Sequence, residues 1–150
     1  MSGPMTREAA TAFANAAHEA SRRGDRRVGT DHLLLGLLHD PTIAASLGTD
    51  VETARAAAER LDRAALAAIG LDLTTAPPSA IRRRPGSASP TSGLRAAISR
   101  AVGLAAAEGQ RKAEPGHLLE ALFECRRPDP AAELLEAMDL GPRARTGTPR

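Results

Sequence analysis

The sequence predicts an all-α domain built from two similar halves. Alanine and leucine dominate an apolar fraction of 42%, Phe13 and Phe123 are the only aromatic residues, and tryptophan and tyrosine are absent. This composition favours closely packed helices, because strands prefer β-branched and aromatic side chains. Apolar residues also recur at three- and four-residue steps through most of the chain. A length of 150 residues is sufficient for one domain with its own core.

The first half of the chain, residues 5–70, begins with two predicted helices. The first starts at an N-cap on Thr6 and stops at Gly24, which favours the left-handed conformation of a helix end. The second is rich in leucine. Thr30 is its predicted N-cap, and Asp31 places a negative charge at the positive end of the helix dipole.

Two further helices complete this half. A brief helical turn over residues 43–47 stops at Gly48, and a longer helix follows an N-cap on Asp50. Apolar residues repeat every three or four positions along the longer helix and are therefore expected to face the interior. They are Val51, Ala54, Ala58, Leu61, Ala65 and Ile69.

The second half repeats the pattern after a linker. Residues 74–90 are rich in proline, serine and arginine, as is typical of an exposed linker. Residues 91–140 then contain a helix starting at Thr91, a helix with Pro115 in its first turn, and a short final helix. The last helix of this repeat is predicted to be missing or cut short, and residues 141–150 are predicted to be a disordered tail.

An offset of 85 residues superposes the two halves. The aligned pairs are Thr6 and Thr91, Gly24 and Gly109, and His32 and His117. Each histidine lies at the same distance after the glycine of its own repeat, and two leucines follow it directly. Duplication is the natural interpretation, with the two copies packed about an approximate twofold axis.

Composition narrows the location and the class of protein. The net charge is only +2, and the single cysteine, Cys125, excludes an internal disulfide and suits a reducing compartment. No apolar run approaches the roughly 18 residues of a membrane span, and residues 1–7 lack the apolar region of a signal peptide. The sequence therefore predicts a soluble, monomeric cytoplasmic protein.

Residues 29–38 carry a family resemblance. Their sequence, GTDHLLLGLL, resembles the GTEHLLLGLL signature of the Clp N-terminal domain family, and a weaker copy lies at residues 114–123. The likeness extends over about residues 5–140. It implies the duplicated four-helix module at the front of ClpC- and ClpA-type unfoldases, which docks adaptors and substrates and has no catalytic activity of its own.

The motor of an unfoldase is missing from this sequence. No G-x-x-x-x-G-K-[ST] phosphate loop occurs, and the chain ends about where the family's N-terminal domain ends. No catalytic constellation, metal-ligand spacing or cofactor motif is found either. We therefore expect a free-standing N-domain and not an enzyme.

The resemblance also implies a ligand site at the start of the leucine-rich helix. In some ClpC-type members the acidic residue of the signature helps to bind phosphorylated arginine, which gives Thr30 and Asp31 a ligand role here. A helix cap alone is a sufficient explanation for both residues, and it is the interpretation that the sequence favours. In the second copy the matching position is Gly116, which has no carboxylate, and Pro115 removes a backbone donor.

Other residues are assigned by the resemblance to a peptide groove or to structure. Family repeats open with Phe-Thr, where this chain has Met5-Thr6 and Pro90-Thr91. The candidates for a groove between the repeats are Met5, Thr6, Phe13, Thr91 and Leu94. The histidines His32 and His117 are expected to be structural and to bind loop carbonyls.

Two functional hypotheses follow. The first is a protein-binding module of the Clp protease system that acts as an adaptor, a competitor or a decoy. Its partners would be ClpC-type unfoldase clients, adaptors or peptide ligands, including Clp-targeting peptide antibiotics. The alternative is a small basic helical nucleic-acid-binding regulator that uses the arginines of residues 22–27 and 82–84. The absence of interleaved aromatic residues or a recognisable DNA-binding motif disfavours it.

Overall fold

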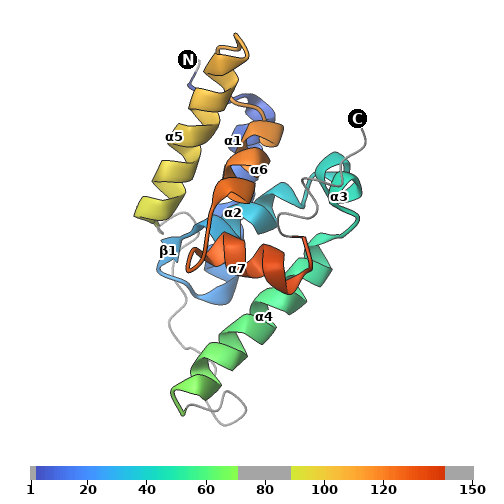
Figure 1. The fold of residues 1–150 in the computed structure, drawn as a ribbon, viewed down its shortest axis with the longest axis vertical. Coiled ribbons are helices and arrows are strands. Elements are labelled where there is room, and N and C mark those ends of the chain that lie inside the picture. Colours follow the sequence, from blue (N-terminus) through green and yellow to red (C-terminus); the bar gives the residue numbers. More distant parts are fainter. Residues whose placement is uncertain (1–2, 71–88, 141–150) are drawn as a thin grey trace.

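The fold is all-α, as predicted, in a computed structural model that describes residues 3–70 and 89–140. These residues form seven helices (Figure 1): α1 (Arg7–Arg23), α2 (Thr30–Leu37), α3 (Pro41–Leu47), α4 (Val51–Ala68), α5 (Ser92–Ala107), α6 (Pro115–Glu124) and α7 (Pro130–Ala137). Two short strands, β1 (Arg27–Val28) and β2 (Ser89–Pro90), pair in parallel. No helix in the described ranges combines the length and apolarity needed to cross a membrane. Most of the predicted linker and all of the predicted tail lie outside these ranges.

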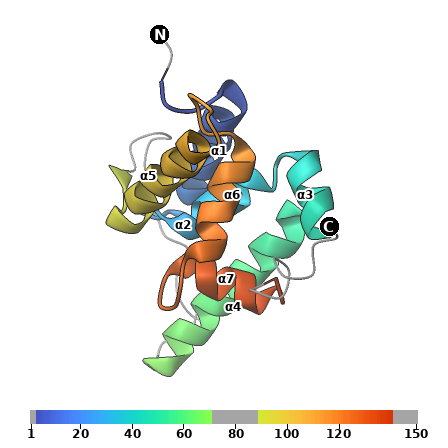
Figure 2. The same ribbon diagram turned by 45° about the horizontal axis from the view of Figure 1, so that its top comes forward.

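The leucine-rich helix α2 is the centre of the core, with α1, α6 and α7 around it (Figures 1 and 2). Four of its leucines have no exposed surface: Leu33, Leu34, Leu35 and Leu37. α1 crosses α2 at Gly36, where an added Cβ would lie 2.3 Å from the carbonyl oxygen of Ala12 and 2.7 Å from the backbone nitrogen of Ala16. The alanines of α1 and the glycine of α2 therefore allow the two backbones to approach closely.

The helix caps follow the sequence prediction with one correction. The hydroxyls of Thr6 and Thr91 accept hydrogen bonds from first-turn backbone N–H groups at 3.2 and 3.0 Å, as N-caps do. The predicted N-cap Thr30 is instead the first residue of α2, and Gly29 is the cap. The Thr30 hydroxyl is therefore used elsewhere.

The opening segment of each repeat forms a backbone hydrogen bond with the other repeat. The backbone N–H of Thr6 donates to the carbonyl of Ala113, and that of Thr91 donates to the carbonyl of Val28, both at 2.9 Å. Because Thr6 aligns with Thr91 and Val28 with Ala113 at the 85-residue offset, these are two copies of one contact. This reciprocal pairing is the signature of an approximate dyad. The short strands were not predicted, because two-residue pairings leave no periodic signal in the sequence.

Helix α4 departs from the prediction at its C-terminal end. Its buried residues are Ala54, Ala57 and Ala58. Ala65 and Ile69, predicted to face inward, are exposed, Ile69 to 71%. Both views show the end of α4 extending away from the other helices (Figures 1 and 2). The apolar stripe therefore continues past the core that it was predicted to cover.

The second repeat contains counterparts of the first three helices of repeat one. α3 and α7 both start with an aspartate N-cap followed by proline, at Asp40-Pro41 and Asp129-Pro130. A counterpart of α4 would follow Leu140, outside the described residues. The prediction that the second repeat is cut short therefore concerns a part of the chain that the structure does not describe.

Candidate functional site

The first turn of α2 is surrounded by carboxylates that share one guanidinium. Arg23, from the end of α1, approaches Asp31 at 3.2 Å and Asp25 at 3.6 Å, and it also pairs with Asp62 of α4. Its side chain is only 17% exposed. Burial favours a lower pKa for Arg23, but the hydrogen bond to Asp62 and the charges of Asp25 and Asp31 outweigh burial and raise it. Arg23 thus fixes the end of α1 to both α2 and α4.

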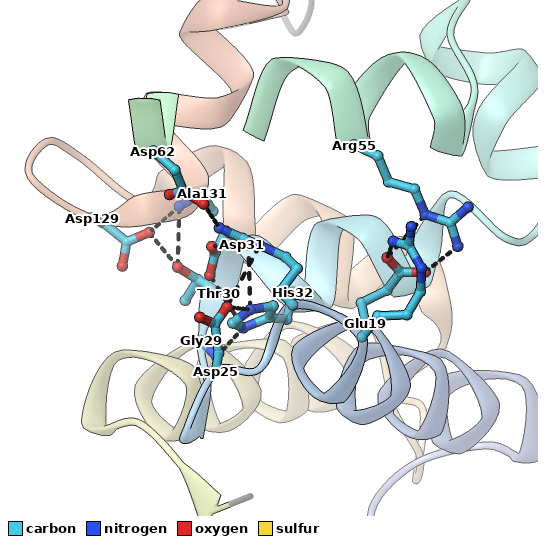
Figure 3. A network of polar contacts seen from close by, with 12 residues as sticks. Glu19, Asp25, Gly29, Thr30, Asp31, His32, Arg55, Asp62, Asp129 and Ala131 are labelled. Atoms are coloured by element: carbon cyan, nitrogen blue, oxygen red, sulfur yellow. Dashed lines mark hydrogen bonds and ion pairs between the residues drawn. The ribbon is translucent and has the colours of Figure 1, made fainter. Parts of the chain in front are cut away.

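The histidine of each repeat closes the loop before its helix. Nδ1 of His32 accepts the backbone N–H of Gly29 at 2.8 Å, and Nε2 lies 2.7 Å from Asp25 (Figure 3). Nδ1 of His117 likewise accepts the backbone N–H of Glu114 at 2.9 Å. A backbone N–H can only donate, so Nε2 carries the proton and donates to the carboxylate. Both histidines are structural in this geometry, but their partners are an N–H and a carboxylate instead of the loop carbonyls that the sequence suggested.

Thr30 joins the two repeats. Its hydroxyl donates to Asp129 at 2.6 Å and accepts the backbone N–H of Ala131 at 3.1 Å, so α2 is attached directly to the start of α7 (Figure 3). The side chain is buried, with 1% of the residue exposed. Thr30 is therefore unable to contact a ligand without breaking this joint.

A cleft of about 150 Å³ opens beside this joint, between α4 and α7. Its apolar wall consists of Ala58, Leu61, Ala65, Pro128, Pro130 and Leu134, and its polar lining of Arg23, Asp31, Asp62 and Glu133. A second hollow, of about 210 Å³, shares Leu61 and Glu133 with the first and continues along α7 to Glu136, Ala137 and Arg127. We call the two together the α4–α7 cleft. It lies where α4 of repeat one meets α7 of repeat two.

Comparison with known proteins identifies the fold's family. The sequence model of the Clp repeat (R) N-terminal domain matches residues 4–138, which include both repeats. The chain belongs to the Clp repeat N-terminal domain family. Among solved structures, the N-terminal domain of the caseinolytic protease associated chaperone ClpD from Arabidopsis thaliana is similar, with a TM-score of 0.67 and 21% identity over 95% of this chain and 93% of that one. Curated protein sequences give no significant match. In Clp unfoldases this domain binds substrates and adaptors and is non-catalytic.

Of the two predicted ligand residues of this Clp repeat domain, the cleft contains Asp31 alone. The Asp31 side chain is 19% exposed and paired with Arg23, so a ligand's guanidinium must compete with an internal one. Thr30 serves the joint between the repeats. A carboxylate at this position was visible in the sequence, whereas its pairing with the end of α1 was not.

The predicted groove residues do not gather around the α4–α7 cleft. Leu94 has no exposed surface, so it packs in the core and is unable to line a groove. The hydroxyls of Thr6 and Thr91 are occupied as helix caps. Met5 pairs with Ala113 across the dyad, and the predicted groove residue Phe13 is half-buried against the core.

A second polar network was missed by the sequence analysis. Glu19 of α1 is completely buried, and it accepts hydrogen bonds from Arg55 of α4 at 3.0 and 2.5 Å (Figure 3). It also accepts a hydrogen bond from His39 at 2.9 Å. Arg22 adds a contact at 3.5 Å. The available signal was the position of Glu19, three residues after Ala16 on the inward face of α1. A carboxylate at such a position requires a buried partner.

Two further groups of this Clp repeat domain were candidates in the sequence, the thiol of Cys125 and the arginines of residues 22–27 and 82–84. Burial, and then the negative charge of Asp129, raise the pKa of the Cys125 thiol to about 11, which disfavours the reactive thiolate. No three histidine, cysteine, aspartate or glutamate side chains in the described ranges are grouped to hold a metal ion. Among the arginines of the nucleic-acid alternative, Arg22 and Arg23 pair with carboxylates, and residues 82–84 lie outside the described ranges.

Proposed function

We propose that this chain is a protein- and peptide-binding module of the Clp protease system that acts as an adaptor, a competitor or a decoy for the unfoldase N-domain. The family supports the binding role, because the same domain binds substrates and adaptors in Clp unfoldases. The observation that carries the proposal is the α4–α7 cleft, which places open apolar surface next to the family signature at the start of α2.

The physical basis for binding is the mixture of exposed apolar and charged side chains in this cleft. Partly exposed Leu61 and exposed Ala65 offer area that a bound segment can remove from water, at roughly 25 cal/mol per Å² of apolar surface. The surrounding carboxylates and guanidiniums can fix the register of that segment. Such a surface can hold a peptide, and the proposed partners are ClpC-type unfoldase clients, adaptors and peptide ligands, including Clp-targeting peptide antibiotics.

The test of this proposal is a reconstituted competition assay. Degradation of an adaptor-dependent substrate by a ClpC-type unfoldase and its peptidase is measured with increasing amounts of this protein. A competitor or decoy lowers the rate, and an adaptor raises the rate for its own clients. Immobilised protein is tested in parallel for capture of the unfoldase, its adaptors and a peptide antibiotic. No change in rate together with no capture contradicts the proposal.

Binding of phosphoarginine at Asp31 is tested by a separate experiment. The geometry requires a substrate's guanidinium to displace Arg23 from Asp31. Calorimetric titration with free phosphoarginine, compared between the natural protein and Asp31→Asn, measures whether that exchange occurs. Binding that Asp31→Asn abolishes supports the ligand role of Asp31, and equal binding or none assigns Asp31 to structure alone.

A further inference from the structure

The α4–α7 cleft has an apolar stripe that the rest of the described protein does not cover. Along α4 the stripe runs from buried Ala58 through Leu61 to exposed Ala65 and Ile69. A helix normally buries such a face against a neighbouring element. Here α7 contacts only part of it, and the end of α4 extends beyond the core.

The charges of the cleft are predominantly negative and lie at its edges. Its lining includes four carboxylates, from Asp31, Asp62, Glu133 and Glu136, but only two guanidiniums. One guanidinium, from Arg23, is held at one end by Asp31 and Asp62. The other, Arg127, lies at the far end and pairs with Glu136 at 3.2 Å, with both side chains at least 60% exposed. Both ends of the cleft therefore already bind a guanidinium through carboxylates.

Of the four carboxylates in the cleft, Glu133 is the one that pairs with neither guanidinium of the lining. It lines both hollows, as Leu61 of α4 does, so it lies where the two hollows meet. The Glu133 side chain makes no hydrogen bond or ion pair with another residue of the described ranges, and it is partly buried. A half-buried carboxylate between apolar walls is a favourable partner for a cation whose aliphatic stem packs on those walls, as arginine and lysine stems do.

We propose that the α4–α7 cleft docks a basic segment of a partner protein, with an arginine or lysine on Glu133 and aliphatic side chains on Leu61 and Ala65. This inference rests on the proposed binding function and specifies the chemistry of the bound segment. Charge selects basic over acidic segments, and the apolar stripe of α4 supplies the contact area. Since the charge pairs are near the surface, binding weakens as salt rises.

The probe is a fluorescein-labelled twelve-residue peptide that carries leucines and two arginines, together with the same peptide with glutamates in place of the arginines. Fluorescence anisotropy with the full chain is expected to show binding of the arginine peptide at low salt. The glutamate peptide is expected to bind at least tenfold more weakly. Equal affinity for the two peptides, or no binding of either, overturns the inference.

A charge exchange separates docking from mere stability. The Glu133→Arg variant should no longer bind the arginine peptide and should bind the glutamate peptide. The control Glu59→Arg lies on the exposed surface of α4 outside the cleft and should leave both affinities unchanged. Glu133→Gln should lower the affinity for the arginine peptide about two- to fivefold, which is the range expected for the loss of one exposed ion pair. An unchanged preference in Glu133→Arg places the peptide elsewhere and refutes the assignment.

The outcome is independent of the competition assay. If the protein changes Clp-dependent degradation but Glu133→Arg does so equally well, the binding function stands and the basic-segment inference fails. If the arginine peptide binds at Glu133 but degradation is unaffected and no Clp component is captured, the cleft assignment stands and the proposed function fails.

Discussion

The buried carboxylate of Glu19 provides the sharpest test of how this fold is stabilised. Glu19 has no exposed surface and receives hydrogen bonds from Arg55 and His39, so it connects α1 to α4 and to the residues after α2. The perturbation is Glu19→Gln, which keeps the shape and a hydrogen-bond acceptor but removes the charge. Arg55 and its neighbours are then left without their main counter-ion.

The contribution of the charged Glu19 to the free energy of unfolding follows from its pKa. Burial raises the pKa of Glu19, but the hydrogen bonds from Arg55 and His39 outweigh it and lower the pKa from 4.5 to about 2. At about 1.4 kcal/mol per pKa unit, the charged form contributes about 3 kcal/mol to the free energy of unfolding. Because the folded-state pKa lies below the unfolded one, this contribution is complete above pH 4.5 and is lost as the pH falls toward 2.

Urea unfolding followed by circular dichroism at several pH values measures this contribution; tryptophan and tyrosine fluorescence is not an option in this chain. At pH 7, Glu19→Gln is expected to lose about 2 to 3 kcal/mol of unfolding free energy. The difference from the natural protein should shrink between pH 5 and pH 3. Glu59→Gln, at an exposed position of α4, serves as the control and should match the natural protein. A loss below about 0.5 kcal/mol at pH 7, or a difference that does not change with pH, refutes the reasoning.

Four other residues give three further predictions. Gly36→Ala should lower the unfolding free energy by more than about 2 kcal/mol because its Cβ meets the carbonyl oxygen of Ala12, whereas Gly103→Ala, with no atom within 4 Å, should raise it by up to about 1 kcal/mol; urea unfolding compares the two. Thr30→Val should cost about 1–3 kcal/mol by leaving buried polar groups unpaired, and Thr30→Ser should restore most of it in the same assay. Cys125 should react with a disulfide reagent at pH 8 at least tenfold more slowly in the folded protein than in urea, and equal rates would contradict burial of its thiol.

The elements of the fold were predictable because their signals are local. Thr6, Asp50 and Thr91 cap the helices that the sequence assigned to them, and Gly24 and Gly109 adopt the positive φ that a helix end requires. The duplication was predictable for the same reason, since it repeats those signals at a constant offset. A local pattern does not contain the reciprocal contacts between the repeats, which two-residue strands make.

The cleft was only partly predictable because its residues come from four helices and from the loop before α7. Asp31 stands in a motif, so the sequence could point to it. Arg23 looked like a favourable charge at the end of α1, and nothing nearby in the sequence indicates that it reaches Asp62 of α4. Glu133 falls on a short helix of the weaker repeat, and its place in the cleft depends on the joint between Thr30 and Asp129.

Helix α4 shows why periodicity alone is insufficient to locate a binding surface. The same three- and four-residue spacing continues from Ala54 to Ile69. The sequence therefore predicts that every apolar residue on this face is buried. The spacing states which side chains share a face, but it contains no information on where the neighbouring helices end. In the structure the neighbours cover Ala54 and Ala58 and stop before Ile69, which is 71% exposed. The apolar face of α4 extends past the helices that cover it, and it lies next to Glu133, whose carboxylate has no partner among the described residues. Such a surface has the composition of an interface core with a charged rim. The excess length of this stripe is therefore the feature that turns a structural helix into a candidate docking surface.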